Sequence, residues 1–377
     1  MISKPLITFV FGTRPEAIKL APVILTFISC PKIKIRVVLS GQHREMVSQV
    51  LDMFEIKPDK DLNIMKHSQS LTDITSKTLV GLEQEFNQFK PDLVLVQGDT
   101  TSAFAAAIAS FYAKVPVGHI EAGLRTDDIF NPFPEEINRR LISQLASINF
   151  APTLMSAKNL AASKLIGDIH ITGNTVIDAL QIISKDLPTI NIPNLDWENN
   201  KVILTTIHRR ENWGANLDSI CDGLIKVIKE FDNVIFVIPM HKNKLVREPL
   251  KRYLGDLSRV FLLEPFDYKT LLGFMKNCFC ILSDSGGIQE EAPSFKKPIL
   301  ILRETTERKE IIDTGKGILI GTDSENILKF VSKLLIDNEF YKSMVVGENP
   351  FGDGKSSKRI LNICLEKLGI NNHVDNI

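Results

Sequence analysis

The stretch ITFVFGTRPEAIKLAPVI, residues 7–24, is the part of the sequence that best indicates the fold class. An apolar run over 7–11 predicts a buried strand, Gly12 predicts a tight turn, and a helix is expected from Arg14 onward. This order is typical of a nucleotide-binding α/β unit, but the G-x-G-x-x-G spacing of a dinucleotide site is absent. Arg14 and Lys19 instead stand near the start of the helix, where the helix dipole disfavours cations. We therefore expect them to bind an anion such as a phosphate.

Glu16 has a simpler explanation within the same helix start. Thr13 and Glu16 match the S/T-x-x-E capping box, in which both side chains satisfy free N–H groups of the first turn. We therefore favour a structural cap for Glu16 over a role in chemistry.

Short apolar runs alternate with helical patterns along almost the whole chain. Continuously apolar runs are typical of parallel strands covered on both faces, with helices as crossovers. The sequence therefore predicts an α/β fold with two doubly wound, Rossmann-like domains facing a cleft. The expected strands are 7–11, 35–40, 93–97, 115–120 and 148–152 in the first half, and 201–207, 233–239, 260–264, 278–283, 298–302 and 317–321 in the second.

One segment, 183–200, interrupts this alternation because it is rich in proline, asparagine and aspartate and has little periodicity. We predict a linker there. It would join an N-terminal domain over 1–182, which carries acid/base residues, to a phosphate-binding C-terminal domain over 201–354. Residues 355–377 include a predicted helix, which we expect to pack back on the N-terminal domain.

The bulk composition excludes several classes of partner. Lys+Arg and Asp+Glu both number 45 in 377 residues, so no net charge recruits nucleic acid or an anionic membrane. No apolar run approaches the roughly 20 residues of a membrane span, and charges interrupt the N-terminal run, so we expect neither a membrane helix nor a signal peptide. The five cysteines are scattered, which indicates reduced thiols in a cytoplasmic protein and no metal site.

Charged side chains follow the predicted strands of the first half, at the edge where parallel sheets bind ligands. Asp99 follows the strand 93–97, where it also fits a helix N-cap, and Glu121 follows the strand 115–120 with no helix behind it. If these strands are neighbours, about 4.8 Å apart, both carboxylates face one cleft. They would then raise each other's pKa, which suits proton transfer.

Glu135 and Glu136 open the next predicted helix, after the prolines of NPFPEE. Acids in a first turn complement the helix dipole, which accounts for one glutamate but not obviously for both. One of the two therefore stays a candidate for the site.

The second half carries a pattern that favours phosphate binding. His208 follows a strand together with two arginines, which indicates an anion site with a group that exchanges protons near neutral pH. Ser285, Gly286 and Gly287 follow another strand and lead into a helix, so bare backbone N–H groups can face a diphosphate.

Two further side chains belong to the same predicted site. Glu291 comes one turn after the glycines and can accept hydrogen bonds from ribose hydroxyls, and Arg308 lies near the same rim. A nucleotide-linked small molecule fits this division, with its diphosphate on the second half and its reacting part near the acids of the first.

Eight motifs occur in order along the chain: FGTRPEAIK, QHREM, GDTTS, GHIEAGLRT, FPEEINRR, ITGNTVIDAL, HRREN and SDSGGIQEEAPS with TTER. Together they resemble the non-hydrolysing UDP-N-acetylglucosamine 2-epimerases over essentially the whole chain. The resemblance implies a glycosyltransferase-B type fold, a homodimer, and interconversion of UDP-GlcNAc and UDP-ManNAc for surface polysaccharides, with no cofactor. In that family, C2 proton loss with elimination of UDP gives 2-acetamidoglucal, and UDP then adds back.

The resemblance also implies a role for each matched residue. Three carboxylates and a histidine are expected to handle protons, a lysine and an arginine to hold the sugar phosphate, and a further group to bind UDP. The residues for proton transfer are Asp99, Glu121, Glu135 and His208. Those at the sugar phosphate are Arg14 and Lys19, and Lys19 is also expected to take part in catalysis. Those that bind UDP are Ser285, Gly287, Glu291 and Arg308, together with the neighbouring Gly286.

Some bacterial members of that family bind a second UDP-GlcNAc as an allosteric activator. By resemblance Gln42, His43 and Gln69 are candidates for such a site. The arginine that those members place after LNIM is absent, because residues 65–70 read MKHSQS. Activation by substrate is therefore left open.

Four alternatives remain open at this point. A glycosyltransferase of the same fold would use the diphosphate site but has no need of three carboxylates. A 2-epimerase for a modified UDP-N-acetylhexosamine would share every motif. A hydrolysing epimerase would release free ManNAc, and in the family it usually carries a fused kinase domain. A nucleotide-sugar sensor would bind without turnover and would not need intact acids.

Overall fold

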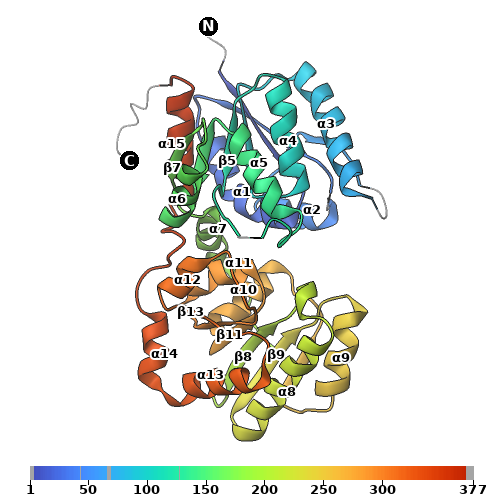
Figure 1. Ribbon diagram of the computed structural model, residues 1–377, viewed down its shortest axis with the longest axis vertical. Helices are drawn as coiled ribbons and strands as arrows, with labels where there is room; N and C mark the ends of the chain where they lie inside the picture. The colour runs from blue at the N-terminus through green and yellow to red at the C-terminus, as the bar shows by residue number, and fades with distance from the viewer. Residues whose placement is uncertain (1–3, 43, 66–68, 127, 371–377) are drawn as a thin grey trace. The chain divides into compact units, whose positions relative to one another are not determined.

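The computed structural model describes residues 4–370 apart from 43, 66–68 and 127. The chain divides into two compact units, Met1–Ile182 with Phe351–Ile377, and Ile183–Pro350 (Figure 1). Each unit is built on a parallel sheet with covering helices, so the predicted α/β class with two doubly wound, Rossmann-like domains is confirmed.

The strands of the described residues pair only in parallel. In the first unit the sheet order is β3-β2-β1-β4-β5-β6-β7, and in the second it is β10-β9-β8-β11-β12-β13. The bounds are β1 (Leu6–Phe11), β2 (Lys34–Leu39), β3 (Lys60–Asp61), β4 (Leu93–Gln97), β5 (Val117–Ile120), β6 (Ile148–Ala151), β7 (Asp168–Ile171), β8 (Lys201–Thr206), β9 (Val234–Pro239), β10 (Val260–Leu263), β11 (Cys280–Ser283), β12 (Ile299–Ile301) and β13 (Gly317–Leu319).

Helices connect successive strands in both units. Their bounds are α1 (Arg14–Ile28), α2 (Arg44–Met53), α3 (Leu71–Gln88), α4 (Thr101–Tyr112), α5 (Glu135–Leu145), α6 (Leu154–Ala162), α7 (Thr175–Ile183), α8 (Ala215–Glu230), α9 (Lys244–Leu254), α10 (Tyr268–Asn277), α11 (Gly286–Glu291), α12 (Lys309–Asp313), α13 (Ser324–Ile336), α14 (Asn338–Val345) and α15 (Ser356–Lys367).

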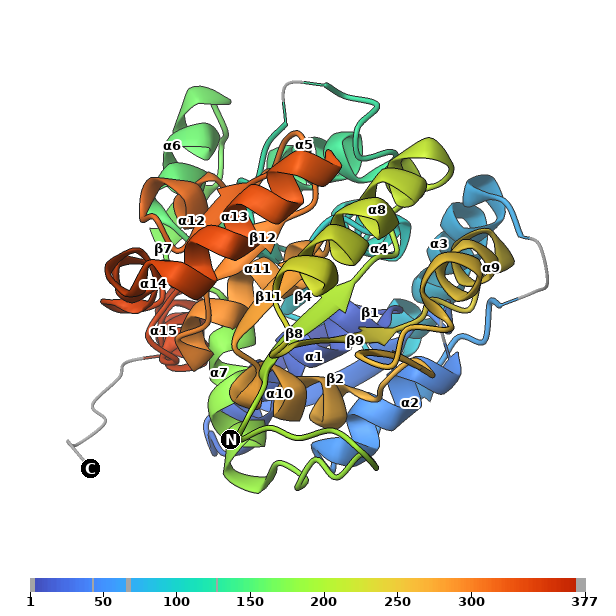
Figure 2. The ribbon, with the colours of Figure 1, turned by 90° about the horizontal axis from the view of Figure 1, so that it is seen from below.

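The helices of each unit form layers. In the first unit α3 contacts α4 and α4 contacts α5, while α1 contacts α2 and α15. In the second unit α8 lies beside α13, as Figure 2 also shows. Aliphatic side chains from the strands and these helices fill the space between the layers, so the strand ends carry the polar groups.

The predicted strands agree with the observed ones to within two residues at either end. Two further strands were not predicted. β3 consists of two polar residues, and β7 is an edge strand whose side chains are all at least partly exposed. Neither has an apolar run, because neither is covered on both faces.

Residues 183–200 belong to the second unit. They begin with Ile183, the last residue of α7, and contain a short 3₁₀ turn, η1 (Ser184–Asp186). The ring of Trp197 lies 5.7 Å from that of Phe274 on α10.

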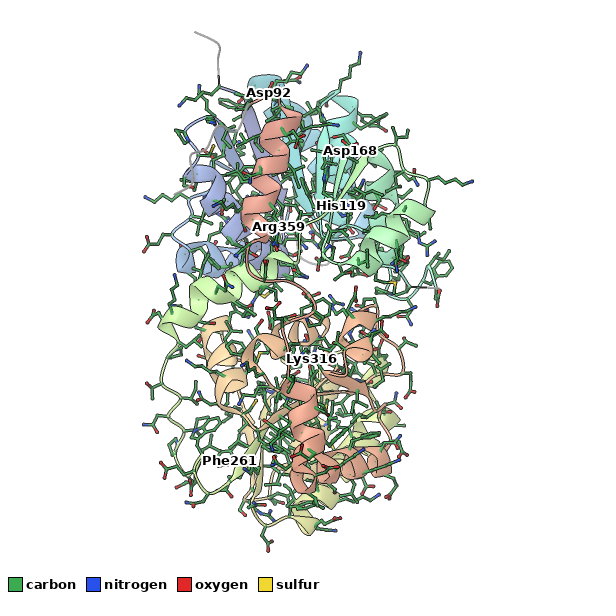
Figure 3. All side chains as sticks on the ribbon, turned by 90° about the vertical axis from the view of Figure 1, so that its left-hand side faces the viewer. Asp92, His119, Asp168, Phe261, Lys316 and Arg359 are labelled. Atoms are coloured by element: carbon green, nitrogen blue, oxygen red, sulfur yellow. The ribbon has the colours of Figure 1, made fainter. Side chains whose placement is uncertain are left out.

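Residues from Phe351 onward belong to the first unit, where α15 packs on α1. The buried carboxylate of Asp178 accepts the N–H groups of Ser356 at 3.2 Å and Ser357 at 2.8 Å. Arg359 on α15 donates to the carbonyl of Thr172 at 3.0 Å (Figure 3). The return segment is thus tied to the end of β7 and to α7.

Two expectations from composition can be compared with the structure. No helix among the described residues is long and apolar enough to cross a bilayer. All five cysteines, which lie within the described ranges, are free thiols.

Candidate active site

The central strands of the first sheet bring the predicted acids together. β1, β4 and β5 are adjacent, and Gln97 at the end of β4 lies opposite Ile120 at the end of β5. The condition on which the shared cleft of Asp99 and Glu121 depended, that β4 and β5 are neighbours, is therefore met. The residues that follow them, Asp99 and Glu121, therefore stand at one edge of the sheet.

Glu121 is the most elaborately held of these side chains. Its φ of 64° lies in the left-handed region, which a residue with a Cβ rarely adopts and which functional sites often retain. Lys19 donates a hydrogen bond to Oε1 and the amide of Gln97 donates to Oε2. Asn174 donates to Oε1 at 3.3 Å. One cation and two amides thus fix the orientation of this carboxylate.

Lys19 forms an ion pair inside the first unit. Lys19 is only 8% exposed on α1, and in the first unit its ammonium pairs with the carboxylate of Glu121. A carboxylate of the protein therefore offsets the charge of Lys19, and the contact with a ligand phosphate stays a prediction. Arg14, the first residue of α1, stands half-buried at the same end of that helix.

Glu16 is a helix cap, as predicted. Its Oε2 accepts the N–H groups of Gly12 at 3.1 Å and Thr13 at 2.7 Å, and its Oε1 accepts the hydroxyl of Thr100 at 2.7 Å. Burial raises the pKa of Glu16, and these hydrogen bonds offset the effect only in part. The carboxylate joins the turns after β1 and β4.

Asp99 does not cap α4, so that interpretation was wrong. The hydroxyl of Thr100 takes this role and accepts the N–H of Ala103 at 3.0 Å. The carboxylate of Asp99 instead accepts a hydrogen bond from Arg139, and the amide of Asn138 donates to the Asp99 carbonyl at 2.9 Å. Two residues of α5 therefore hold the turn after β4.

The two glutamates at the start of α5 have different surroundings. Glu136 is 0% exposed and accepts the N–H of Thr126 at 3.0 Å and Nε of Arg140 at 2.7 Å. A guanidinium nitrogen of Arg139 lies 3.3 Å from the same carboxylate. Glu136 is thus structural, whereas Glu135 is half-buried at the first position of the helix.

His119 supports the turn after β4 from inside the unit, where Figure 3 labels it. Its Nε2 lies 2.7 Å from the carbonyl of Gly98, and its Nδ1 lies 3.5 Å from the hydroxyl of Ser143 on α5. Burial lowers the pKa of His119 to about 4, so the ring is neutral near pH 7 and donates from Nε2. The sequence signal was a polar residue inside an apolar strand.

In the second unit, His208 and Asp284 meet at the ends of two neighbouring strands, β8 and β11. Nδ1 of His208 lies 2.7 Å from Oδ1 of Asp284, which is 0% exposed. Burial raises the pKa of Asp284, but His208 and the backbone N–H groups of His208 and Arg209 outweigh it, so the net pKa is lowered. Sequence reasoning missed Asp284, although an acid at a strand end was the available signal.

The predicted diphosphate residues gather at the start of α11. Arg308 donates from Nε to Glu290 at 2.7 Å and also contacts Glu307. A Cβ on Gly286 would lie 2.6 Å from this guanidinium, so any larger residue there would have to displace the ion-paired Arg308 side chain. A Cβ on Gly287 would meet nothing closer than the Ser285 hydroxyl at 4.0 Å. The surface at Gly287 is therefore open, as a cradle for phosphate oxygens requires.

Glu291, the predicted ribose ligand, ends α11 and is almost fully buried. Its Oε1 accepts the hydroxyl of Tyr268 at 2.7 Å. Tyr268 therefore orients this carboxylate, which the sequence did not indicate.

Arginines surround a buried carboxylate beside this cradle. Arg303 donates to Glu307 at 3.0 Å, and Arg209 lies 3.7 Å from it. Burial raises the pKa of Glu307, but Arg308, Arg303 and Arg209 together hold it far below its usual range. The ionised glutamate fixes the guanidinium groups at the rim of the site.

The candidates for an allosteric site lie apart from these groups in the chain. Oε1 of Gln42 accepts the hydroxyl of Ser102 at 2.8 Å, Gln69 is half-buried, and His43 lies outside the described residues.

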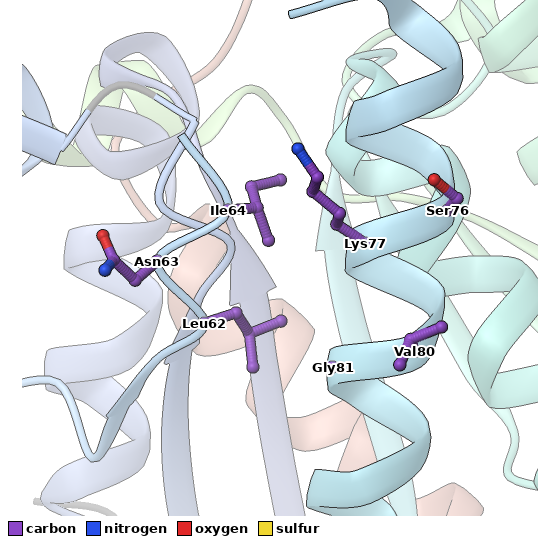
Figure 4. Close-up of a pocket in the computed structure, with 7 residues that line it drawn as sticks. All are labelled: Leu62, Asn63, Ile64, Ser76, Lys77, Val80 and Gly81. Atoms are coloured by element: carbon purple, nitrogen blue, oxygen red, sulfur yellow. The ribbon is translucent and has the colours of Figure 1, made fainter. Parts of the chain in front are cut away.

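A hollow of about 360 Å³ opens beside α3, without any predicted site residue in its lining (Figure 4). It is lined by Leu62, Asn63, Ile64, Ser76, Lys77, Val80 and Gly81. Within the described residues no cluster of His, Cys, Asp and Glu fits a metal ion.

Known proteins are similar to this chain over most of its length. A family model described as UDP-N-acetylglucosamine 2-epimerase matches residues 28–365. The UDP-N-acetylglucosamine 2-epimerase of Bacillus subtilis is 47% identical over 362 residues, which cover 96% of this chain and 95% of that protein.

Two solved structures are similar over nearly their full lengths. The UDP-GlcNAc 2-epimerase from Neisseria meningitidis, bound to UDP-GlcNAc, has a TM-score of 0.91 and 46% identity, covering 96% of this chain and 100% of that one. The S. aureus MnaA–UDP structure has a TM-score of 0.89 and 42% identity, covering 99% of each chain.

Proposed function

Because this chain belongs to the UDP-N-acetylglucosamine 2-epimerase family, we propose that it interconverts UDP-GlcNAc and UDP-ManNAc without hydrolysis. The observation that carries the proposal is the carboxylate of Glu121, which Lys19, Gln97 and Asn174 hold at the edge of the first sheet. A carboxylate fixed in this way is suited to removing a proton from carbon, because its lone pairs keep one direction.

Inversion at C2 needs proton-handling groups on opposite faces of the sugar. One group removes the C2 proton while UDP leaves with the electron pair of the C1–O bond, and a C1=C2 double bond forms. UDP then adds back to C1, and C2 receives a proton on the other face. The acids that support this proposal are Asp99 and Glu121 at the ends of β4 and β5 and Glu135 at the start of α5.

Departure of UDP requires groups that stabilise a diphosphate. We assign this role in the second unit to Arg308 and to backbone N–H groups at Gly286 and Gly287, supported by the open surface at Gly287. Glu291 would bind the ribose. Arg14 and Lys19 would contact the sugar phosphate, and Lys19 would also help to stabilise the developing charge.

Three wider statements belong to the same proposal. The product would supply surface polysaccharide synthesis from the cytoplasm, where the free cysteines stay reduced. The chain would act as a homodimer.

The feature that supports association is an exposed apolar stripe on α5 and the segment before it. It consists of Phe133, Ile137 and Leu141, which are spaced four residues apart. Ile137→Glu would then give a monomer in light scattering, and a persistent dimer would exclude this face.

Substrate activation is a separate question at Gln42, His43 and Gln69. We propose these residues as the place where a second UDP-GlcNAc would bind. Because the arginine of activated members is absent, we expect a hyperbolic dependence of initial rate on UDP-GlcNAc. A sigmoidal dependence that Gln42→Ala abolishes would contradict this expectation.

Incubation with UDP-GlcNAc and no acceptor tests the proposal. The expected product is UDP-ManNAc, seen by chromatography and NMR. Stoichiometric free ManNAc would indicate the hydrolysing reaction, and an unchanged sugar would indicate a transferase, a sensor or a modified substrate.

Glu121→Gln should lower turnover at least about 100-fold while UDP still binds. The matched control is Glu85→Gln, which removes a buried carboxylate paired with Arg36 outside the site. Wild-type turnover in Glu121→Gln would refute the assignment.

A further inference from the structure

We propose that Asp284 is a positioning residue for His208, holding its imidazole in the tautomer with the proton on Nδ1. Nε2 is then the nitrogen that exchanges a proton with the ligand. This inference rests on the proposed function and on the proton-transfer role that the resemblance to the family implies for His208. It adds Asp284, to which no role has been assigned above.

The distances favour a dedicated ring contact. Nδ1 of His208 lies 2.7 Å from Oδ1 of Asp284. Asp284 is fully buried, whereas the side chain of His208 is 44% exposed, so one edge of the ring faces the interior and the other is accessible. Within the described residues, Nε2 of His208 has no protein hydrogen-bond partner.

The two carboxylate oxygens of Asp284 have different hydrogen-bond partners. Oδ2 accepts the N–H groups of His208 and Arg209, both at 2.9 Å, and the amide of Asn212 at 3.0 Å. Oδ1 receives only one weaker backbone contact, from the His208 N–H at 3.2 Å. The main short contact of Oδ1 is therefore the one with Nδ1 of the His208 ring.

An ionised carboxylate can only accept hydrogen bonds, so the ring nitrogen that faces it must carry a proton. The same charge stabilises the imidazolium that forms when Nε2 is protonated. In the elimination, Nε2 would give this proton to an oxygen of the departing diphosphate. The ring would then be neutral, with its remaining proton on Nδ1, and the reverse step would restore the imidazolium.

A purely structural aspartate would behave differently. Joining the turn after β8 to the end of β11 needs only an acceptor for the three donors at Oδ2, which an asparagine oxygen supplies. Asp284→Asn thus keeps that junction but places an NH₂ group opposite Nδ1. This group donates to Nδ1 and moves the ring proton to Nε2.

The test combines ring NMR with kinetics on the full chain. The ¹⁵N signals of His208, identified by their loss in His208→Gln, should show an Nδ1–H ring in the wild type and an Nε2–H ring in Asp284→Asn. Turnover should fall by about 10²–10⁴-fold, with the dissociation constant of UDP changed less than about threefold. In a His208→Gln background, Asp284→Asn should change the residual rate less than about twofold.

The matched control is Asp178→Asn in the first unit. It removes a buried carboxylate that also accepts two backbone N–H groups, from Ser356 and Ser357, and should leave turnover within about threefold.

The proposal is overturned by an Nε2–H ring in the wild type, by an unchanged tautomer in Asp284→Asn, or by an equal rate loss in the two backgrounds. A wild-type chain that does not epimerise UDP-GlcNAc refutes the proposed function instead, because the ring signals and UDP binding test the pairing without turnover.

Discussion

Lys19 on α1 donates a hydrogen bond to Glu121 after β5, although 102 residues separate them in the chain. The contact exists because β4 lies between β1 and β5, so the elements that follow all three strands converge at one edge. Lys19, which the sequence predicts to bind phosphate, and Glu121, which it predicts to transfer protons, thus form one ion pair. We therefore expect substitution of either residue to lower turnover.

Lys19→Met should therefore impair turnover even if substrate still binds. The change keeps the length of the side chain but leaves the Glu121 carboxylate without its cation and removes a positive charge from the sugar site. We expect turnover to fall at least about 100-fold, measured as UDP-ManNAc formed per minute. Lys34→Met, which changes an exposed lysine on β2, is the control. Equal rates in the two variants would refute a role for Lys19.

Arg139→Met should destabilise the first unit. Arg139 is almost fully buried and pairs with Asp99 and Glu136, so its loss leaves nearby carboxylates with less compensation. The expected cost is about 3 kcal/mol in the free energy of unfolding, from urea titration. Arg44→Met, at an exposed pair with Asp61, should cost less than about 1 kcal/mol. A similar small cost at both sites would contradict the structural role of Arg139.

Two neighbouring glycines of α11 should respond differently to alanine. Gly286→Ala places a Cβ 2.6 Å from the ion-paired guanidinium of Arg308, so it should lower both the melting temperature of the free protein and its affinity for UDP. Gly287→Ala has room in the free protein, and should weaken UDP binding with little change in melting temperature. Calorimetry with and without UDP separates the two. An unchanged melting temperature in Gly286→Ala would contradict the packing described here.

His119 should make stability depend on acid pH. Its folded-state pKa of about 4 lies below the ordinary 6.5, so between these values the unfolded chain binds a proton that the folded chain does not. Its neutral ring therefore stabilises the fold above pH 6.5, and this contribution is lost as pH falls toward 4. At about 1.4 kcal/mol per pH unit, the penalty of His119→Gln should be roughly 2 kcal/mol smaller at pH 5 than at pH 7. An equal penalty at both pH values would exclude a buried neutral ring.

The sequence predicted the parts of this fold that depend on local pattern. Apolar runs located the buried strands, and the S/T-x-x-E spacing located the cap at Glu16. The edge strand β7 was missed because partial exposure removes the apolar run. Asp99 was considered as a cap of α4, but Thr100 fits equally well on sequence grounds, and only the backbone geometry shows that Thr100 is the cap.

The partners of the site residues could not be predicted in the same way. Gln97 reaches Glu121, and Asp284 reaches His208, because the strands that carry or precede them are neighbours in their sheets. Asn174 follows β7, which β6 separates from β5, and it reaches Glu121 along the same edge of the sheet. Strand order is a long-range property that no local pattern encodes. The motifs therefore located the reactive side chains, while the structure was needed to identify the groups that hold them.

Proton NMR of the protein with UDP-GlcNAc in deuterium oxide tests the central claim most directly. Proton removal at C2 through an eliminated UDP predicts that UDP-ManNAc appears and that deuterium enters C2 of both sugars. Glu121→Gln should suppress both changes, whereas Glu85→Gln should not. An unchanged spectrum, or UDP-ManNAc that keeps its original C2 proton, would contradict the account.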